Sequence, residues 1–247
     1  MSSKHLTRRA LEVLSNADVV FLEKYTSMAP EELFERVYRI AGGRVVEVCR
    51  RELEDENAKV LFKELEKGLE VALAVIGDPF IATTHNYIRI EALKRGFKVE
   101  YVPGINIYTY AASLTGLFIY KFGGSATIVY PRGEIVSEHP YIVLRENLER
   151  GLHTFFFLDL SEERGFMKPD EAIEILRRIE KRYNGSLMNS GNKIVVLERL
   201  GFNDEHVYYI SIGGVLSRRW SNPPYSIIYP GKLHFMEEDS LELYRID

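Results

Sequence analysis

Val71-Ala-Leu-Ala-Val-Ile-Gly-Asp-Pro79 is the stretch of sequence that decides the fold. Its first six residues are all apolar, which is typical of a central parallel strand buried on both faces. The next three form a loop, and residues 85–95 have the pattern of a helix. A strand, a loop and a helix in this order indicate a parallel sheet with crossover helices. Such sheets bind ligands beyond the carboxyl ends of their strands.

The same alternation runs through the first part of the chain. We predict strands at residues 19–22, 45–48 and 97–102, and helices at residues 6–14, 30–42 and 52–67. Val102-Pro-Gly104 then indicates a boundary between two halves of the chain. We therefore expect an N-terminal α/β domain over residues 1–102 and a second domain over residues 103–247.

The second half has a different pattern. We predict helices at residues 106–115, 140–150 and 169–182, and strands at residues 126–130, 154–160, 194–200 and 206–212. The link between the last two strands is too short for a helix, so they form an antiparallel pair. The expected fold is α/β, with a parallel sheet in the first domain and a mixed sheet in the second.

Composition limits the function. The chain has 247 residues, 46% of them hydrophobic, with a net charge of −4, so a broad basic surface for nucleic acid is not expected. The apolar run at 71–76 is too short to span a bilayer, and we expect no membrane partner. A lone cysteine, Cys49, cannot form an intramolecular disulfide, and it reads as a small core residue. These features favour a cytoplasmic protein.

Common catalytic and metal-binding patterns are missing from the sequence. The six histidines include no pair three or four residues apart, and one cysteine cannot supply a zinc cluster, so we expect no metal site. There is no Gly-x-Ser-x-Gly elbow and no Walker-type loop. We therefore assign no catalytic residue from these patterns.

The loop Gly77-Asp78-Pro79 is the strongest local candidate for a site. Gly77 would let a ligand approach the backbone, Pro79 would make the loop rigid, and amides at the next helix start would suit a carboxylate. An ordinary strand-to-helix turn with Asp78 as a cap is an equally good interpretation. The segment at 102–107 is either a ligand-binding crossing or a plain linker. The segments at 222–225 and 229–234 read as hairpin turns.

Several segments taken together resemble a known family. They are His5-Leu-Thr-Arg-Arg-Ala-Leu11, Glu23-Lys-Tyr-Thr-Ser27, Gly77-Asp-Pro-Phe-Ile-Ala-Thr-Thr-His85, Thr115-Gly-Leu-Phe-Ile-Tyr-Lys-Phe-Gly123, Glu146-Asn-Leu-Glu-Arg-Gly-Leu-His-Thr154 and Pro230-Gly-Lys-Leu-His234. In this order they resemble the tetrapyrrole methylases, which are class III S-adenosylmethionine-dependent methyltransferases. The extensions at 82–85 and 120–123 are similar to the branch that acts in diphthamide biosynthesis, in its archaeal forms.

The resemblance implies two α/β domains with a cofactor cleft between them, usually in a homodimer. It implies S-adenosylmethionine bound in a folded shape, with S-adenosylhomocysteine as product. Carried over by position, the cofactor contacts are Asp78, Ile81, Asn106, Ile107, Leu158, Leu200 and Tyr225. Leu200 and Tyr225 differ from the smaller residue and the histidine that the family has there, although Tyr225 can still donate a hydrogen bond.

The implied reaction methylates the modified histidine of translation elongation factor 2, up to a trimethylammonium group. Since the sulfonium is already a strong methyl donor and an uncharged amine is already a nucleophile, catalysis needs positioning and water exclusion more than an acid or a base, and we name no catalytic base. Two alternatives stay open. One is a tetrapyrrole or precorrin methyltransferase with the same fold, and the other is a non-catalytic binding module.

One departure from the family concerns the amino-terminal region. Family members begin with a strand and a glycine-rich loop ahead of the first helix, and Met1 falls just inside the end of that loop. The resemblance therefore implies that the first strand of the N-terminal sheet is missing from this chain. A start codon placed too late is the explanation that we favour, and a deliberately shortened chain or a protein that manages without this strand are the alternatives.

Overall fold

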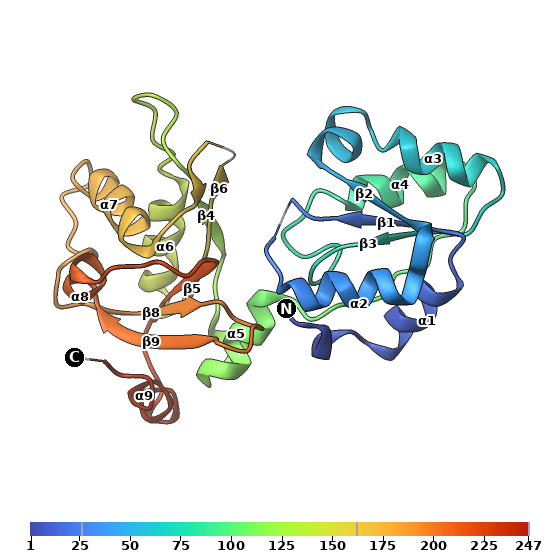
Figure 1. Ribbon diagram of the computed structural model, residues 1–247. Helices are drawn as coiled ribbons and strands as arrows, with labels where there is room; N and C mark the ends of the chain where they lie inside the picture. Colours follow the sequence, from blue (N-terminus) through green and yellow to red (C-terminus); the bar gives the residue numbers. More distant parts are fainter. Residues whose placement is uncertain (26, 162, 247) are drawn as a thin grey trace. The chain divides into compact units, whose positions relative to one another are not determined.

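A computed structural model describes residues 1–25, 27–161 and 163–246 (Figure 1). Thr26, in the motif at 23–27, lies outside the described residues. The chain divides into two compact units. Unit 1 comprises Met1–Ile107 with Gly201–Asn203, and unit 2 comprises Tyr108–Leu200 with Asp204–Asp247. The boundary that we expected after Val102 lies within unit 1.

Unit 1 contains a three-stranded sheet in the order β2-β1-β3. Its strands are β1 (Val19–Glu23), β2 (Val45–Val48) and β3 (Val71–Ala74), and both pairings are parallel. The register places Val20 opposite Val45 on one side and opposite Ala72 on the other. The parallel sheet expected for the first half of the chain is confirmed.

Helices cover both faces of this sheet (Figure 1). On one face α1 (Arg8–Asn16) packs with α2 (Glu31–Ala41), preceded by the short turn η1 (Ser3–His5) and followed by η2 (Gly42–Arg44). On the other face lie α3 (Lys59–Glu66) and α4 (Asn86–Lys94). Thr7 starts α1, because its side chain accepts a hydrogen bond from the amide of Ala10.

Two cores form on the two faces because strand side chains alternate. Val20 and Leu22 pack against α1 and α2, whereas Phe21 packs against α3 and α4. This arrangement is the doubly wound architecture that the alternating pattern predicts.

The helix predicted at residues 52–67 is wrong in its first half. Residues Arg51–Asp55 form a single wide turn (η3), and α3 begins only at Lys59. Asn57 and Ala58 between them have positive φ angles of 54° and 52°. This break turns the chain so that Leu53 and Ala58 are both fully buried in one core, which a continuous helix would not achieve. Cys49, just ahead of the break, is exposed and is not a core residue.

The strand predicted at residues 97–102 is also wrong. This segment belongs to no sheet within the described part of the chain, although it runs along the same cavity as β3. The stretch at 71–76, expected to be buried on both faces, is mostly half-buried. The reason is that β3 lies at the edge of the sheet, with a cavity beside it.

Unit 2 contains a five-stranded sheet in the order β4-β5-β10-β8-β9. Its strands are β4 (Ala126–Ile128), β5 (Thr154–Leu158), β8 (Lys193–Glu198), β9 (His206–Ser211) and β10 (Tyr225–Tyr229). β4 and β5 are parallel and the other pairs are antiparallel, so the predicted mixed sheet and the predicted β8–β9 pair are both confirmed. The central strand, β10, was not predicted. A small hairpin, β6 (Leu160–Ser161) with β7 (Gly165–Phe166), follows β5.

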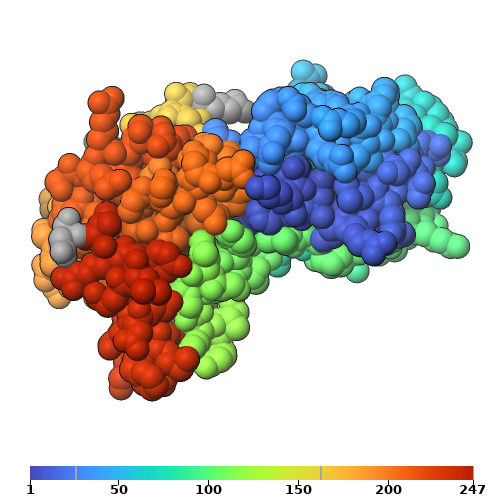
Figure 2. Space-filling model, turned by 60° about the horizontal axis from the view of Figure 1, so that its bottom comes forward, coloured from blue at the N-terminus to red at the C-terminus, as the bar shows by residue number. Residues whose placement is uncertain are grey.

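The helices of unit 2 are α5 (Ile107–Thr115), η4 (Ile119–Lys121), α6 (His139–Glu149), α7 (Pro169–Glu180), α8 (Ile212–Ser217) and α9 (Phe235–Glu242). Side chains of α6, α7 and α8 share one core with the sheet. The C-terminal segment packs on α5, where Tyr244 donates to the carbonyl of Leu114 at 2.8 Å and Ser240 to that of Thr115 at 2.9 Å (Figure 2). No helix in the described ranges is both long and apolar enough to cross a membrane.

Candidate functional site

The loop after β3 is held by the buried carboxylate of Asp78. It accepts hydrogen bonds from the amide of Phe80 at 2.9 Å, the hydroxyl of Tyr101 at 2.5 Å and the amide of Gly104 at 3.2 Å. Asp78 therefore fixes its own turn and also ties it to the segment at 101–104. This second contact joins the two parts of unit 1 in which four of the expected cofactor contacts lie.

Glycines allow the two segments to approach each other closely. Gly77 has a φ of +93°, a conformation that favours glycine. A Cβ atom added to Gly104 would lie 1.8 Å from the carbonyl oxygen of Gly77. The close backbone approach that we assigned to a ligand at Gly77 is thus made, at least in part, by another segment of the same chain.

The helix predicted at residues 85–95 is confirmed as α4, within one residue at each end. α4 starts at Asn86, and its first amides are bonded within the chain, from Tyr87 to the carbonyl of Thr84 and from Ile88 to that of His85. These two amides are therefore not open to a carboxylate. Asp78 is not the helix cap either, since it caps the turn at Phe80.

The other expected contacts in unit 1 lie close in sequence to Asp78 and to Gly104, which are hydrogen-bonded to each other. Ile81 is 45% exposed in this loop. Asn106 and Ile107 are half-buried and lie two and three residues after Gly104, at the start of α5. The hydrogen bond from Gly104 to Asp78 brings the loop and this start of α5 together.

The three expected contacts in unit 2 gather at one end of its sheet. Leu158 is the last residue of β5, and Tyr225 is the first residue of the neighbouring β10. Tyr225 pairs with Glu198, the last residue of β8, and Leu200 lies just beyond it. Residues distant in sequence thus converge at this end of the sheet.

Tyr225 is more enclosed than its expected role suggests. Its hydroxyl accepts a hydrogen bond from the amide of Asn222 at 2.7 Å, and its ring contacts that of Trp220 edge to face. Burial raises the pKa of Tyr225 to about 12. The hydroxyl therefore keeps its proton near neutral pH and can still donate it.

A second polar cluster lies beside the loop in unit 1. The ring of His85 is buried, 6.4 Å from the ring of Tyr25. The hydroxyls of Tyr25 and Thr84 both donate to Glu54, at 3.2 and 3.0 Å. Burial lowers the pKa of His85, and the charges of Glu23 and Glu54 oppose this shift. Sequence reasoning missed this cluster because its members come from separate segments with no common spacing.

A buried network in unit 2 joins three of the motifs that carry the resemblance. Glu237 accepts from the amide of Phe118 at 2.9 Å, from Nε2 of His153 at 3.0 Å and from the ammonium group of Lys121. The amide of Gly231 donates to Nδ1 of His153 at 2.9 Å, which places the proton of the neutral ring on Nε2. These residues thus have a structural role, which the motifs alone did not reveal.

Electrostatics in this network favour one protonation state. Burial opposes ionisation of Glu237, but the bonds from Lys121 and from the amides of His234 and Phe118 lower the pKa of Glu237 to about 2. Burial lowers the pKa of His153, against the opposing effect of Glu237. The stable pair is thus a carboxylate with a neutral imidazole.

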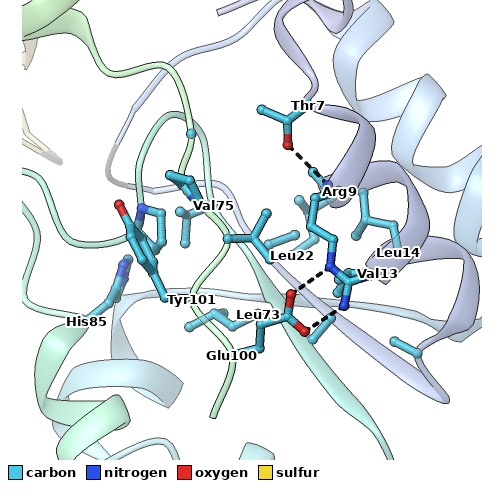
Figure 3. Close-up of a pocket in the computed structure, with 18 of the residues that line it drawn as sticks. Thr7, Arg9, Val13, Leu14, Leu22, Leu73, Val75, His85, Glu100 and Tyr101 are labelled. Atoms are coloured by element: carbon cyan, nitrogen blue, oxygen red, sulfur yellow. Dashed lines mark hydrogen bonds and ion pairs between the residues drawn. The ribbon is translucent and has the colours of Figure 1, made fainter.

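A cavity of about 690 Å³ opens in unit 1 beside the loop (Figure 3). Leu73, Val75, Glu100 and Tyr101 are among the residues that line it. Arg9 of α1 joins its guanidinium to Glu100 through two bonds of 2.6 and 2.7 Å. Among the described residues, no group of three histidine, cysteine or acidic side chains could hold a metal ion.

Comparison with known proteins shows the family to which this chain belongs. The profile of the tetrapyrrole (corrin/porphyrin) methylases matches residues 2–215. The chain belongs to this family, and it is a methyltransferase. The two α/β units, one with a parallel and one with a mixed sheet, agree with that assignment.

The similar proteins narrow the class further. A diphthine synthase of Saccharolobus solfataricus is 38% identical over 243 residues, which cover 98% of this chain and 94% of that protein. A diphthine synthase of Pyrobaculum aerophilum is 39% identical over 238 residues, covering 96% and 92%. A crystal structure of diphthine synthase superposes with a TM-score of 0.83 at 31% identity, covering 98% of this chain and 91% of that one.

Proposed function

We propose that this protein is the S-adenosylmethionine-dependent methyltransferase of diphthamide biosynthesis. Its substrate is the 3-amino-3-carboxypropyl histidine of translation elongation factor 2, whose amino nitrogen it methylates to trimethylammonium. The observation that carries this proposal is the similarity to diphthine synthases over nearly the full length of both chains. The motif extensions at 82–85 and 120–123 favour this substrate over a tetrapyrrole.

The residues present fit such a donor. We propose that Asp78, Ile81, Asn106 and Ile107 of unit 1, with Leu158, Leu200 and Tyr225 of unit 2, form its binding surfaces. In each unit these residues converge at one place in the structure. Apolar side chains, backbone groups and one hydroxyl suit an adenosine and an amino acid, which offer apolar surface and hydrogen-bonding groups.

These residues have separate roles in the proposed mechanism. S-adenosylmethionine, when bound, supplies a methyl group on a sulfonium that is already strongly electrophilic. Asp78 acts by holding two backbone segments in register, because its carboxylate is already bonded to the chain. Ile81 covers apolar parts of the donor and excludes water. Positioning of this kind can contribute about 7–11 kcal/mol to lowering the barrier of a two-substrate reaction.

We also propose that the protein acts in the cytoplasm as a homodimer. Around η4 and the start of α9, Tyr120 is 76% exposed and Phe235 is 65% exposed. Ring contacts through Phe118 and His234 join them into one apolar surface. Such an exposed patch supports self-association. The protein's lone cysteine, Cys49, is exposed and free, which fits a reducing compartment.

The test is methyl transfer from radiolabelled S-adenosylmethionine to elongation factor 2. Factor carrying the 3-amino-3-carboxypropyl histidine is expected to become labelled, and factor with unmodified histidine is the matched control. Labelling of a precorrin instead would favour the tetrapyrrole alternative. Failure to bind S-adenosylhomocysteine in calorimetry would favour a non-catalytic module.

A further inference from the structure

Four polar side chains form a cluster at the carboxyl edge of the sheet in unit 1. Tyr25 lies two residues after β1, and Glu54 lies in η3, the turn that follows β2. Thr84 and His85 lie in the segment between β3 and α4. Because the three strands are parallel, their carboxyl ends share one edge of the sheet, and open parallel sheets bind ligands there.

Glu54 is the centre of this carboxyl-edge cluster. Its Oε1 atom accepts hydrogen bonds from the hydroxyls of Tyr25 at 3.2 Å and Thr84 at 3.0 Å. It is half-buried and forms no ion pair with any lysine or arginine that the structure describes, whereas the nearby Glu56 pairs with Arg51 at 2.8 Å. A carboxylate that is partly removed from water and held by neutral hydroxyls is suited to a cationic ligand.

The two aromatic members of the cluster are neutral. Burial, together with the charge of Glu54, raises the pKa of Tyr25, so this hydroxyl keeps its proton and donates it to Glu54. Burial lowers the pKa of His85 despite its acidic neighbours and the carbonyl of Pro79, so the ring is neutral near pH 7. His85 is 2% exposed, and its Nδ1 atom has no hydrogen-bond partner among the described residues. A buried polar atom without a partner is uncommon and points to a bound ligand, a water molecule or a catalytic role.

Arg50 places a positive charge over the ring of Tyr25. The carbon of its guanidinium group lies 5.5 Å from the ring centroid, and the side chain is exposed. Tyr25 therefore has a carboxylate at its hydroxyl and a guanidinium over its ring. This pairing of charges matches an α-amino acid head group, in which an ammonium and a carboxylate share one carbon atom.

We propose that this site binds the α-amino acid head group of the methyl acceptor, with its ammonium at Glu54 and its carboxylate at Arg50. The modified histidine carries such a group, its 3-amino-3-carboxypropyl chain, so this assignment rests on the proposed function. Ile81 of the proposed donor surface lies three residues before Thr84, and the two sites therefore share one loop. Thr83 closes that loop, since its hydroxyl donates to the carbonyl of Pro79 at 2.5 Å.

Glu54 also receives the proton that the amine must lose. Each methyl transfer breaks the C–S bond of the sulfonium and forms a C–N bond with the lone pair of the amine. One N–H proton passes to Glu54 before each transfer and then to water, which reaches this half-buried carboxylate. Three rounds therefore release three protons and leave a trimethylammonium that has no N–H.

The first experiment measures binding of elongation factor 2 in the presence of S-adenosylhomocysteine, with and without the 3-amino-3-carboxypropyl group. The unchanged protein is expected to bind the modified factor about tenfold more tightly than the factor with unmodified histidine. Glu54→Gln keeps an acceptor for the two hydroxyls but loses the charge, so this preference should disappear. Glu56→Gln, at the carboxylate that pairs with Arg51, is the matched control and should keep the preference.

The second experiment measures the rate of methyl transfer as a function of pH. With Glu54→Gln, kcat should fall about a hundredfold at pH 7, because the bound ammonium has no proton acceptor. The rate should recover above the pKa of the substrate amine, where the free amine needs no acceptor, whereas a merely structural defect would persist at every pH. The other titratable groups around Glu54, which this variant leaves in place, are Glu23, Tyr25, Arg50, His85 and Tyr87.

The outcomes separate this site from the proposed function. An equal preference for the modified factor in Glu54→Gln and Glu56→Gln would overturn the site, whether or not the protein methylates the factor. Weaker binding of S-adenosylhomocysteine by Arg50→Gln, with the preference unchanged, would also overturn it, in favour of the amino acid part of the donor. If the unchanged protein transfers no methyl group but Glu54→Gln alone loses the preference, the proposed function fails and the amino acid site is supported.

Discussion

At the scale of single residues, Asp78 shows how one carboxylate organises two loops. The same side chain holds its own turn and reaches both Tyr101 and Gly104. It is buried, so each lost bond leaves a polar group without its partner. A family motif residue can thus act on a ligand through the backbone that it holds in place.

Removing this carboxylate is expected to loosen unit 1. Asp78→Ala should lower the free energy of unfolding by about 2 kcal/mol, because two amides and a hydroxyl lose their acceptor. Tyr101→Phe removes one of the three bonds and should cost about 1 kcal/mol. Urea unfolding followed by circular dichroism measures both. Equal midpoints for Asp78→Ala and the unchanged protein would contradict the role that we give it.

Ile81 offers a test of the donor surface that does not disturb the fold. Ile81→Ala should change the free energy of unfolding by less than about 0.5 kcal/mol, since the side chain is 45% exposed. It should weaken binding of S-adenosylhomocysteine about tenfold, through lost apolar contact.

Ile90, on α4, is also 45% exposed and provides the matched control. Ile90→Ala should leave the affinity unchanged, and both variants are measured by isothermal titration calorimetry. Equal affinities for the two variants would remove Ile81 from the donor surface.

At the scale of elements, the network of His153, Glu237 and Lys121 ties the start of α9 to η4 and β5. Lys121 and His153 sit in motifs that are far apart in sequence, and Glu237 follows a third motif at 230–234. Their contacts are internal to unit 2, so these motifs stabilise that unit. The exposed rings of η4 and α9 rest on the network, which supports the surface that we assign to a second copy of the chain.

The network makes unit 2 less stable in acid. The folded pKa of His153 is below its unfolded value, so its contribution is present above about pH 6.5 and is lost as the pH falls. The folded pKa of Glu237 is about 2, so its contribution of about 3 kcal/mol is lost between about pH 5 and pH 2.

Trp220 is the single tryptophan and is buried in unit 2, so its fluorescence reports the unfolding of that unit. The urea concentration at the unfolding midpoint should decrease as the pH is lowered from about 7 to 5. His153→Gln should make the dependence of this midpoint on pH weaker. His206→Gln, at an exposed histidine, should leave that dependence unchanged. A slope that is the same in His153→Gln would show that another group causes it.

At the scale of the whole molecule, hydrophobic patterns predict the fold well where a strand is a run of mostly apolar residues. The three strands of unit 1 and the β8–β9 pair were found in this way. β10 was missed because prolines on both sides suggested turns. The strand prediction at residues 97–102 was wrong for a different reason. A strand requires a partner, and the pattern of a sequence does not show whether the partner is present.

The candidate site could be predicted only by way of the resemblance. No spacing rule connects Asp78 with Tyr101, or Leu158 with Tyr225, because sheet register brings such residues together. The cluster around His85 and the network around Glu237 were beyond sequence reasoning for the same reason. What the sequence did supply was the loop after β3, where an apolar strand ends in Gly77 and Asp78.

The central claim is that this protein methylates the modified histidine of elongation factor 2. The most direct test is the intact mass of the factor after incubation with the protein and S-adenosylmethionine. We predict that the mass of the factor increases by the methyl groups that convert its amino nitrogen to trimethylammonium. No increase is expected when the factor carries unmodified histidine. An unchanged mass, with protein that binds S-adenosylhomocysteine and remains folded by Trp220 fluorescence, would contradict the claim.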